Sequence, residues 1–275
     1  GIVFIGRVIA TIFGFFFSLA AARLMGADVY GKLMYVTVII TMLSLVTKLG
    51  LTQGLVQYVS KLTDKEKYVE RNSIITFSFL IVFIFSIILA IIFFIFSELI
   101  AVNIFNNSEL ISLLKIMSPI LILLSLIELT PGIFRGLKIV KYQVLGRDLI
   151  QSFIRLLVVL VLGYMGYKIN GLVTAYYLSM AVSLFYLTYK VYDLNLFGKI
   201  KAKFIKSYKG ILIFSVPLLV SSILHYSISK VDIFMIGYFL DTSSVGIYTI
   251  ALKIGTLTNF LLFSINSMFA PNITT

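Results

Sequence analysis

The chain has 275 residues, of which 60% are hydrophobic and only 12% are charged, and its mean hydropathy is +1.07. A soluble domain does not need so much apolar surface, so the composition indicates a bundle of membrane helices. The absence of cysteine and the single histidine exclude disulfides, cysteine-bound metals and a multi-histidine metal site, and we expect no cofactor. The net charge of +12 does not indicate nucleic-acid binding, because the lysines fall between apolar segments.

Apolar runs predict about eight membrane-spanning helices and therefore an all-α integral membrane protein. They cover residues 2–24, 33–56, 74–96, 111–129, 149–165, 171–189, 211–240 and 245–270. Pro119 and Pro217 fall inside the fourth and seventh segments, where the lost backbone N–H is expected to bend the helix.

Lysine and arginine gather in alternate connections, namely those after the second, fourth and sixth segments. The positive-inside rule therefore places the N-terminus and these three connections in the cytoplasm, in a multi-pass protein of the cell membrane. One connection does not follow the rule, since the cations Arg23 and Lys32 flank the first turn on the outer side. The long basic connection 193–209 is the predicted boundary between a six-helix lobe, residues 1–192, and two helices of a second lobe, residues 210–275. Because the chain starts with Gly1 and stops after the eighth segment, we expect the second lobe to be truncated.

An internal repeat supports this boundary. An offset of 215 residues sets the first two segments against the last two and aligns Gly31 with Gly246, Thr41 with Thr256 and Ser44 with Asn259. Both hairpins would start on the same side of the membrane, so the repeat is parallel. Transporters are often built from such repeats, with the substrate site at their interface.

The same four segments carry polar residues at helical spacing. The stripes are Arg7, Thr11, Gly14 and Ser18; Thr37, Thr41, Ser44 and Lys48; Ser222, His225, Ser229 and Asp232; and Thr249, Lys253 and Thr256. Hydroxyl groups at this spacing also serve helix packing. Because every stripe includes an ionisable group, which is costly in lipid, we favour the walls of a hydrated cavity.

The cations Arg7, Lys48 and Lys253 lie at several depths, as expected if an anion moves past them. We expect them to stand clear of carboxylates, since a paired cation has little attraction left for a substrate. Asp232 is the only clear acid on a stripe, and it could instead pair with Lys230 or Lys253. A further set is expected at the cytoplasmic interface, with snorkelling side chains: Glu128, Arg147, Asp148 and Arg155.

Several short stretches resemble the polysaccharide-exporting flippases of the multidrug/oligosaccharidyl-lipid/polysaccharide superfamily. They are residues 23–31 (RLMGADVYG), 131–137 (PGIFRGL), 171–179, and 231–240 with 245–248 (VDIFMIGYFL and VGIY). The resemblance implies a two-lobed bundle of about twelve to fourteen helices that moves a polyprenyl-diphosphate-linked oligosaccharide from the inner to the outer leaflet by alternating access. A cationic cavity for the diphosphate fits Arg7, Lys48 and Lys253, with Ser222, His225 and Asp232 in its wall. The sequence does not identify a coupling ion.

Two other functions remain as alternatives. A cation-coupled multidrug exporter of the same superfamily would need a cavity richer in acids. A polyprenyl-linked membrane glycosyltransferase would need paired or metal-binding carboxylates on a loop. Asp64, Glu66 and Glu70 sit among lysines and are typical of a solvated loop, so we expect no enzyme.

Overall fold

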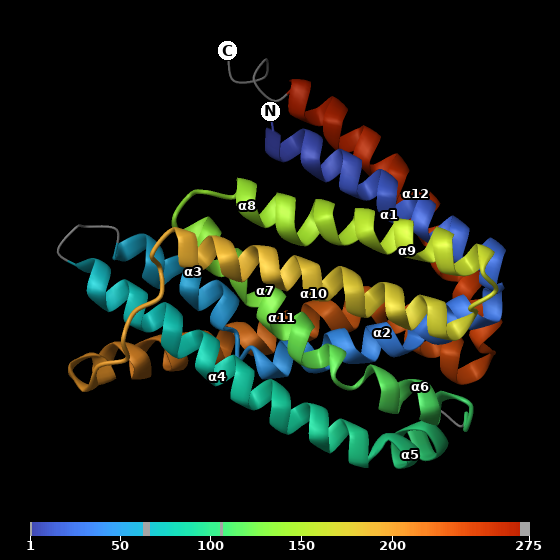
Figure 1. Ribbon diagram of the computed structural model, residues 1–275, viewed down its shortest axis with the longest axis horizontal. Helices are drawn as coiled ribbons and strands as arrows, with labels where there is room; N and C mark the ends of the chain where they lie inside the picture. Colours follow the sequence, from blue (N-terminus) through green and yellow to red (C-terminus); the bar gives the residue numbers. More distant parts are fainter. Residues whose placement is uncertain (1, 63–66, 105–106, 270–275) are drawn as a thin grey trace.

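The computed structural model describes the chain except residues 1, 63–66, 105–106 and 270–275, and side chains are not described for residues 2, 104 and 256–269. The described part is helical (Figure 1). The main helices are α1 (Ile2–Met25), α2 (Ala27–Thr47), α3 (Leu51–Lys61), α4 (Tyr68–Ile95), α6 (Leu110–Met117), α7 (Ile120–Gly136), α9 (Gln151–Tyr164), α10 (Ile169–Asp193), α11 (Ile205–Phe239) and α12 (Thr242–Phe269). The short elements are α5 (Ser97–Leu99), α8 (Lys141–Gln143), two π-helical turns (Ile100–Ile104 and Val144–Ile150) and one 3₁₀ turn (Ala202–Phe204).

All eight predicted segments are helical, which confirms the all-α fold class. Among the described residues, five helices, α1, α2, α4, α10 and α11, are long and apolar enough to cross a membrane, and α6 with α7 makes a sixth if the bent pair is one span. Many large apolar side chains on them are exposed, among them Phe85 on α4 and Phe185 on α10. Such surface suits contact with lipid. Of the residues singled out above, Asp64, Glu66, Thr256 and Asn259 have no described side chains.

The helices bend where backbone hydrogen bonds are lost. The bend predicted at Pro119 is confirmed, since α6 and α7 meet there at 51°. At Pro217, by contrast, α11 continues as one helix of 35 residues. A further break was missed, because the second predicted segment is two helices. Leu49 (φ 50°) and Gly50 (φ 72°) separate α2 from α3 in the left-handed region, and a Cβ on Gly50 would overlap the Ser215 carbonyl of α11.

The middle of the bundle is formed by α2 and α7, which have long series of buried residues. Helix α2 contacts α12, α11 and α7, while α3 packs on α7 and α1 packs on α9. In Figure 1 the α1–α2 and α9–α10 connections lie at one end of the bundle, and the N-terminus and the α10–α11 connection lie at the other. We call the latter the basic end, because the lysine-rich connections meet there.

At the opposite end, α2 and α12 cross with their backbones in contact, and we call this the α2–α12 crossing. A Cβ added to Gly31 would overlap the Thr242 carbonyl oxygen, and one added to Gly246 would overlap the Ala27 carbonyl oxygen. The four positions form two pairs at the offset of 215 residues found in the sequence. This reciprocity is the contact pattern that two repeated hairpins related by a twofold axis produce.

Polar contacts surround the α2–α12 crossing. The Thr242 hydroxyl donates a hydrogen bond to the Asp28 carboxylate. The Lys32 ammonium lies 2.7 Å from Asp28 and 2.5 Å from Glu109, which precedes α6. The Asp28 carboxylate therefore pairs with a cation of its own helix and also accepts a hydrogen bond from α12.

The connection between α10 and α11 is bound to the first turns of α4. The Asn72 amide donates to the Asn195 carbonyl (2.6 Å), the Ser73 hydroxyl to the Lys199 carbonyl (2.8 Å), and the Gly198 backbone N–H to the Thr76 hydroxyl (2.9 Å). The predicted boundary at 193–209 thus falls on an ordered segment that is fixed to one of the helices before it.

Candidate functional site

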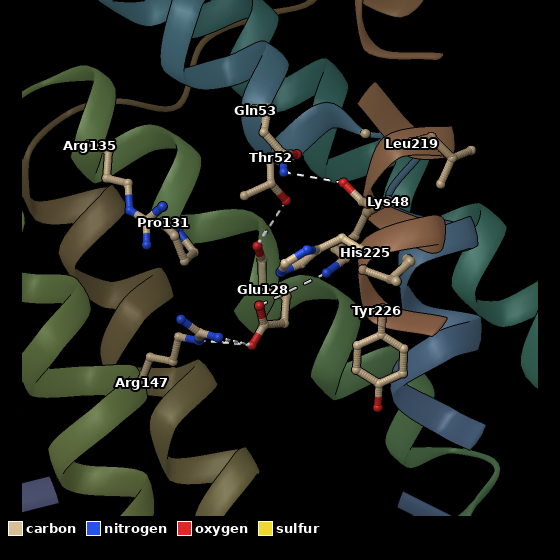
Figure 2. Close-up of a pocket in the computed structure, with 13 residues that line it drawn as sticks. Lys48, Thr52, Gln53, Glu128, Pro131, Arg135, Arg147, Leu219, His225 and Tyr226 are labelled. Atoms are coloured by element: carbon tan, nitrogen blue, oxygen red, sulfur yellow. Dashed lines mark hydrogen bonds and ion pairs between the residues drawn. The ribbon is translucent and has the colours of Figure 1, made fainter. Parts of the chain in front are cut away.

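Two cavities meet in the interior of the described bundle. The first, of about 290 Å³, lies between the α2–α3 break, α7 and α11 (Figure 2). The second, of about 450 Å³, lies between α1, α2, α9, α10 and the π-helical turn before α9. Glu128 and Arg147 line both cavities, so these two side chains stand at the boundary between them.

Glu128, on α7, is held by a cation on each side. One of its oxygens, Oε1, accepts a hydrogen bond from Arg147 Nε (2.8 Å) and lies 2.6 Å from Arg147 Nη2, and the other, Oε2, lies 3.9 Å from Lys48 Nζ (Figure 2). Lys48 is 7% exposed and sits where α2 breaks. The Thr52 hydroxyl of α3 donates to the Glu128 backbone carbonyl (3.0 Å). The carboxylate and its backbone are therefore both fixed.

Opposite charges continue into the second cavity. Asp148 lies 3.9 Å from Arg147 Nη1 and 4.0 Å from Arg7 Nε. Cation and anion thus alternate over five residues, which we call the charge chain: Lys48, Glu128, Arg147, Asp148 and Arg7. Alternation reduces the cost of placing charges in a membrane, which is about 3 kcal/mol or more for an isolated one.

The cavities nevertheless carry an excess of positive charge. Arg135 lines the first and Arg155 the second, which makes five cations against two carboxylates and a net charge of +3. The Arg155 guanidinium lies over the Tyr176 ring at 4.0 Å, and its Nε is buried with no hydrogen-bond partner in the described structure. Such a site attracts anions, and its arginines can bind phosphate with two parallel hydrogen bonds.

Neutral polar groups complete the first cavity. Gln53 Nε2 donates to the Ser222 hydroxyl (3.3 Å), which joins α3 to α11, and His225 and Tyr226 line the same wall (Figure 2). In the second cavity, Thr37 and Thr41 of α2 line the wall. These donors and acceptors can hydrogen-bond a polar ligand next to its charged group.

The predicted site residues fall in two places. Arg7, Lys48, Ser222 and His225 line one or other of the cavities. Lys253 and Asp232 are not among the residues that line them. The Lys253 ammonium donates to the Ser18 hydroxyl and to the Gly14 carbonyl (3.3 Å), and so joins α12 to α1.

Asp232 makes a local contact between the last two helices. Its carboxylate accepts hydrogen bonds from the Tyr248 hydroxyl (2.7 Å) and from the Ile233 backbone N–H (2.8 Å). The ion pairs considered for it, with Lys230 or Lys253, are not among the ion pairs of the described residues.

Two expectations are wrong. Glu128, Arg147, Asp148 and Arg155 do not snorkel outward but line the two cavities, because the bent α6–α7 pair and the π-helical turn bring them inward. Arg7 and Lys48 also do not stand clear of carboxylates, since each lies within 4.0 Å of one. One feature indicates that Glu128 lies inside the bundle. It precedes the end of α7 at Gly136 by eight residues, or about 12 Å, and its neighbours Ile127 and Leu129 are buried.

Known proteins resemble the chain in sequence and in fold. The model of the family described as polysaccharide biosynthesis protein matches residues 1–274. A solved structure described as "Inward-facing conformation of a multidrug resistance MATE family transporter of the MOP superfamily" aligns with a TM-score of 0.66 and 15% sequence identity. The alignment covers 92% of this chain and 61% of that one, so the chain spans less than two thirds of that transporter. No curated protein matches the chain.

Proposed function

Because the chain belongs to the polysaccharide biosynthesis protein family and shares its fold with a transporter of the MOP superfamily, we propose that it is a multi-pass membrane transporter. On this premise we propose that it is a flippase, which moves a polyprenyl-diphosphate-linked oligosaccharide from the inner to the outer leaflet by alternating access. Residues 1–192 form the first lobe of the transporter, and α11 and α12 begin the second.

The net charge of +3 around the charge chain carries this proposal. The diphosphate that links a lipid to a sugar has two negative charges, so it leaves the two cavities with one net positive charge. Arg147 and Arg7 have forked guanidinium groups, and Lys48 adds a point charge at the α2–α3 break. The hydroxyl and amide groups of the first cavity suit the sugar that follows the diphosphate.

The distribution of basic residues supports one orientation. The basic end faces the cytoplasm, and the α2–α12 crossing closes the bundle on the outer side. A thiol reagent that does not cross the membrane tests this orientation, because the chain has no native cysteine. In intact cells we expect labelling of Lys168→Cys, between α9 and α10, and none of Lys201→Cys. The reverse pattern would invert the orientation.

Reconstituted vesicles test the transport itself. A fluorescent polyprenyl-diphosphate oligosaccharide is incorporated into both leaflets, and an impermeant quencher then reports how fast the inner pool becomes accessible. We expect rapid exchange with the native protein and none with Arg147→Met. Exchange at the rate of empty vesicles with the native protein would contradict the proposal.

Export of cationic drugs is the second candidate. Glu128 and Asp148 favour it, since such exporters use acids in their cavities, but both carboxylates are already within 4.0 Å of cations. The positive excess repels a cationic drug. Efflux of ethidium from the same vesicles, without exchange of the lipid, would establish this alternative instead.

A further inference from the structure

We propose that Glu128 and, more weakly, Asp148 are resident counterions, which pair with the cations of the charge chain until the substrate's phosphate groups replace them as partners. This inference rests on the proposed function and assigns to two carboxylates a role in selecting the headgroup. In the empty transporter they neutralise the cations of the charge chain. When a diphosphate arrives, these cations exchange one oxyanion for another.

The contacts of Glu128 match those that a phosphate would make. Its Oε1 lies 2.6 and 2.8 Å from two nitrogens of one guanidinium, and its Oε2 faces an ammonium at 3.9 Å. An arginine fork and a lysine around two oxygens are also a common arrangement for binding phosphate. Because both cavities reach Glu128 and Arg147, a ligand in either one competes with this carboxylate directly.

The backbone indicates which partner moves. Glu128 lies within the regular helix α7, between buried neighbours, and Thr52 binds its carbonyl. Arg147 lies in the π-helical turn Val144–Ile150, and Lys48 lies at the α2–α3 break. Irregular helical turns often occur at functional sites and can change their hydrogen bonding at low cost. The cations can therefore turn toward a ligand, while the carboxylate stays in place.

Competition of this kind selects for charge. Exchange of one carboxylate for a singly charged phosphate leaves the number of charges around Arg147 unchanged and gains little. A diphosphate brings two charges and can satisfy Arg147 together with Lys48 or Arg7. The resident carboxylates thus weaken the binding of every anion. The effect is largest for lipids with a single negative charge, which are abundant in bacterial and organellar membranes.

Binding measurements on the purified protein test this inference. The probes, in detergent, are farnesyl diphosphate and farnesyl methyl phosphate, a phosphodiester that carries one negative charge. Glu128→Gln keeps the shape of the side chain but removes its charge, so we expect farnesyl diphosphate to bind about tenfold more tightly, with a smaller preference over the phosphodiester. Transport should become slower, because the cations lose the internal anion that helps to release the substrate.

A matched control is Asp232→Asn, which removes a carboxylate outside the cavities and should leave both affinities unchanged. If Glu128 only holds Arg147 in position, Glu128→Gln should weaken binding and Glu128→Asp should restore it. Weaker or unchanged binding by a folded Glu128→Gln protein would overturn the inference. Should that variant fail to fold, Asp148→Asn decides the question, since it leaves the Glu128–Arg147 contact intact; we expect about threefold tighter binding.

The two proposals fail in different ways. Binding by the native protein without tightening in Glu128→Gln or Asp148→Asn removes the counterion role and leaves the flippase proposal intact. No binding of farnesyl diphosphate by the native protein or by either folded variant removes both.

Discussion

The two ends of α2 meet their neighbours in opposite ways. At its first turns, Gly31 brings the backbone of α2 against that of α12, with no side chain between them. At its last turn, Lys48 and the break at Leu49 and Gly50 open the helix onto a cavity lined by charges. The first contact depends on the absence of a side chain, whereas the second depends on the charge that a side chain carries.

This difference suits the alternating access that we propose. The backbone contact at the α2–α12 crossing acts only at short range. Its attraction is therefore lost altogether once the two helices separate. The attraction of the charge chain acts over several ångströms and tolerates exchange of partners. One helix therefore combines a contact that is either made or broken with a site that adapts to a ligand.

The largest expected effect comes from breaking the charge chain at its centre. Arg147→Met leaves Glu128 buried without its main partner, and loss of one member of a buried ion pair costs about 3–5 kcal/mol. We expect a marked fall in thermal stability in detergent together with loss of transport. The double variant Arg147→Met/Glu128→Gln should recover stability but not transport. Native-like stability of the single variant would contradict the importance of this pair.

The next effect comes from adding one methyl group to the α2–α12 crossing. Gly246→Ala forces the helices apart and should destabilise the protein by about 1–3 kcal/mol, the usual cost of overpacking. Gly255→Ala on the same helix is the control, since a Cβ there has open space. It should be neutral or stabilising by up to about 1 kcal/mol. Equal unfolding temperatures for the two variants would show that the α2–α12 crossing is not tight.

Two lysines sharpen the boundary of the site. Lys48 lines the first cavity, whereas Lys253 donates to Ser18 and Gly14 outside it. We expect Lys48→Met to weaken the binding of farnesyl diphosphate roughly tenfold and Lys253→Met less than twofold. Equilibrium binding at two salt concentrations checks this, because only the first substitution should reduce the salt dependence. A larger loss of affinity in Lys253→Met than in Lys48→Met would show that Lys253 belongs to the binding site.

The smallest effect concerns the start of α12. The Ser244 backbone N–H binds the Asp241 carboxylate at 2.6 Å and holds the pKa of Asp241 below its usual value. A lowered pKa means that this contact stabilises the folded state above the ordinary pKa of aspartate and is lost as the pH falls below about 4. Asp241→Asn should therefore reduce the acid sensitivity of thermal unfolding slightly. An unchanged pH profile would show that this cap contributes nothing.

The helices and their order could be predicted because they depend on local hydrophobicity. The α2–α12 crossing was also within reach, since the internal repeat by itself aligns Gly31 with Gly246, the two glycines at which the backbones meet. A helix break was harder to predict: Leu49 adopts a left-handed conformation that its side chain disfavours, and the close approach of α11 imposes it.

The centre of the site was missed for a different reason. A stripe of polar residues along one helix is visible in the sequence, but Glu128 is one acid on an apolar helix and its partner Arg147 comes from another element, nineteen residues away. Arg7 and Lys48, each at the end of a stripe, line the cavities as the stripes predict. Lys253 also belongs to a stripe, yet it faces Ser18, because the direction of a helical face depends on tertiary packing.

The attachment of the α10–α11 connection to α4 has a mechanical consequence. The Tyr208 hydroxyl lies 2.5 Å from the Ser73 hydroxyl, and the Tyr208 ring stacks on Phe77 at 4.4 Å, so the first turn of α11 is fixed as well. Helix α11 is then a lever about 50 Å long with its fulcrum at one end. A rotation of about ten degrees at Tyr208 would displace Phe239 by about 8 Å. The α2–α12 crossing lies next to the end of α11 that is farthest from Tyr208. A modest force there is therefore enough to keep the whole of α11 from rotating.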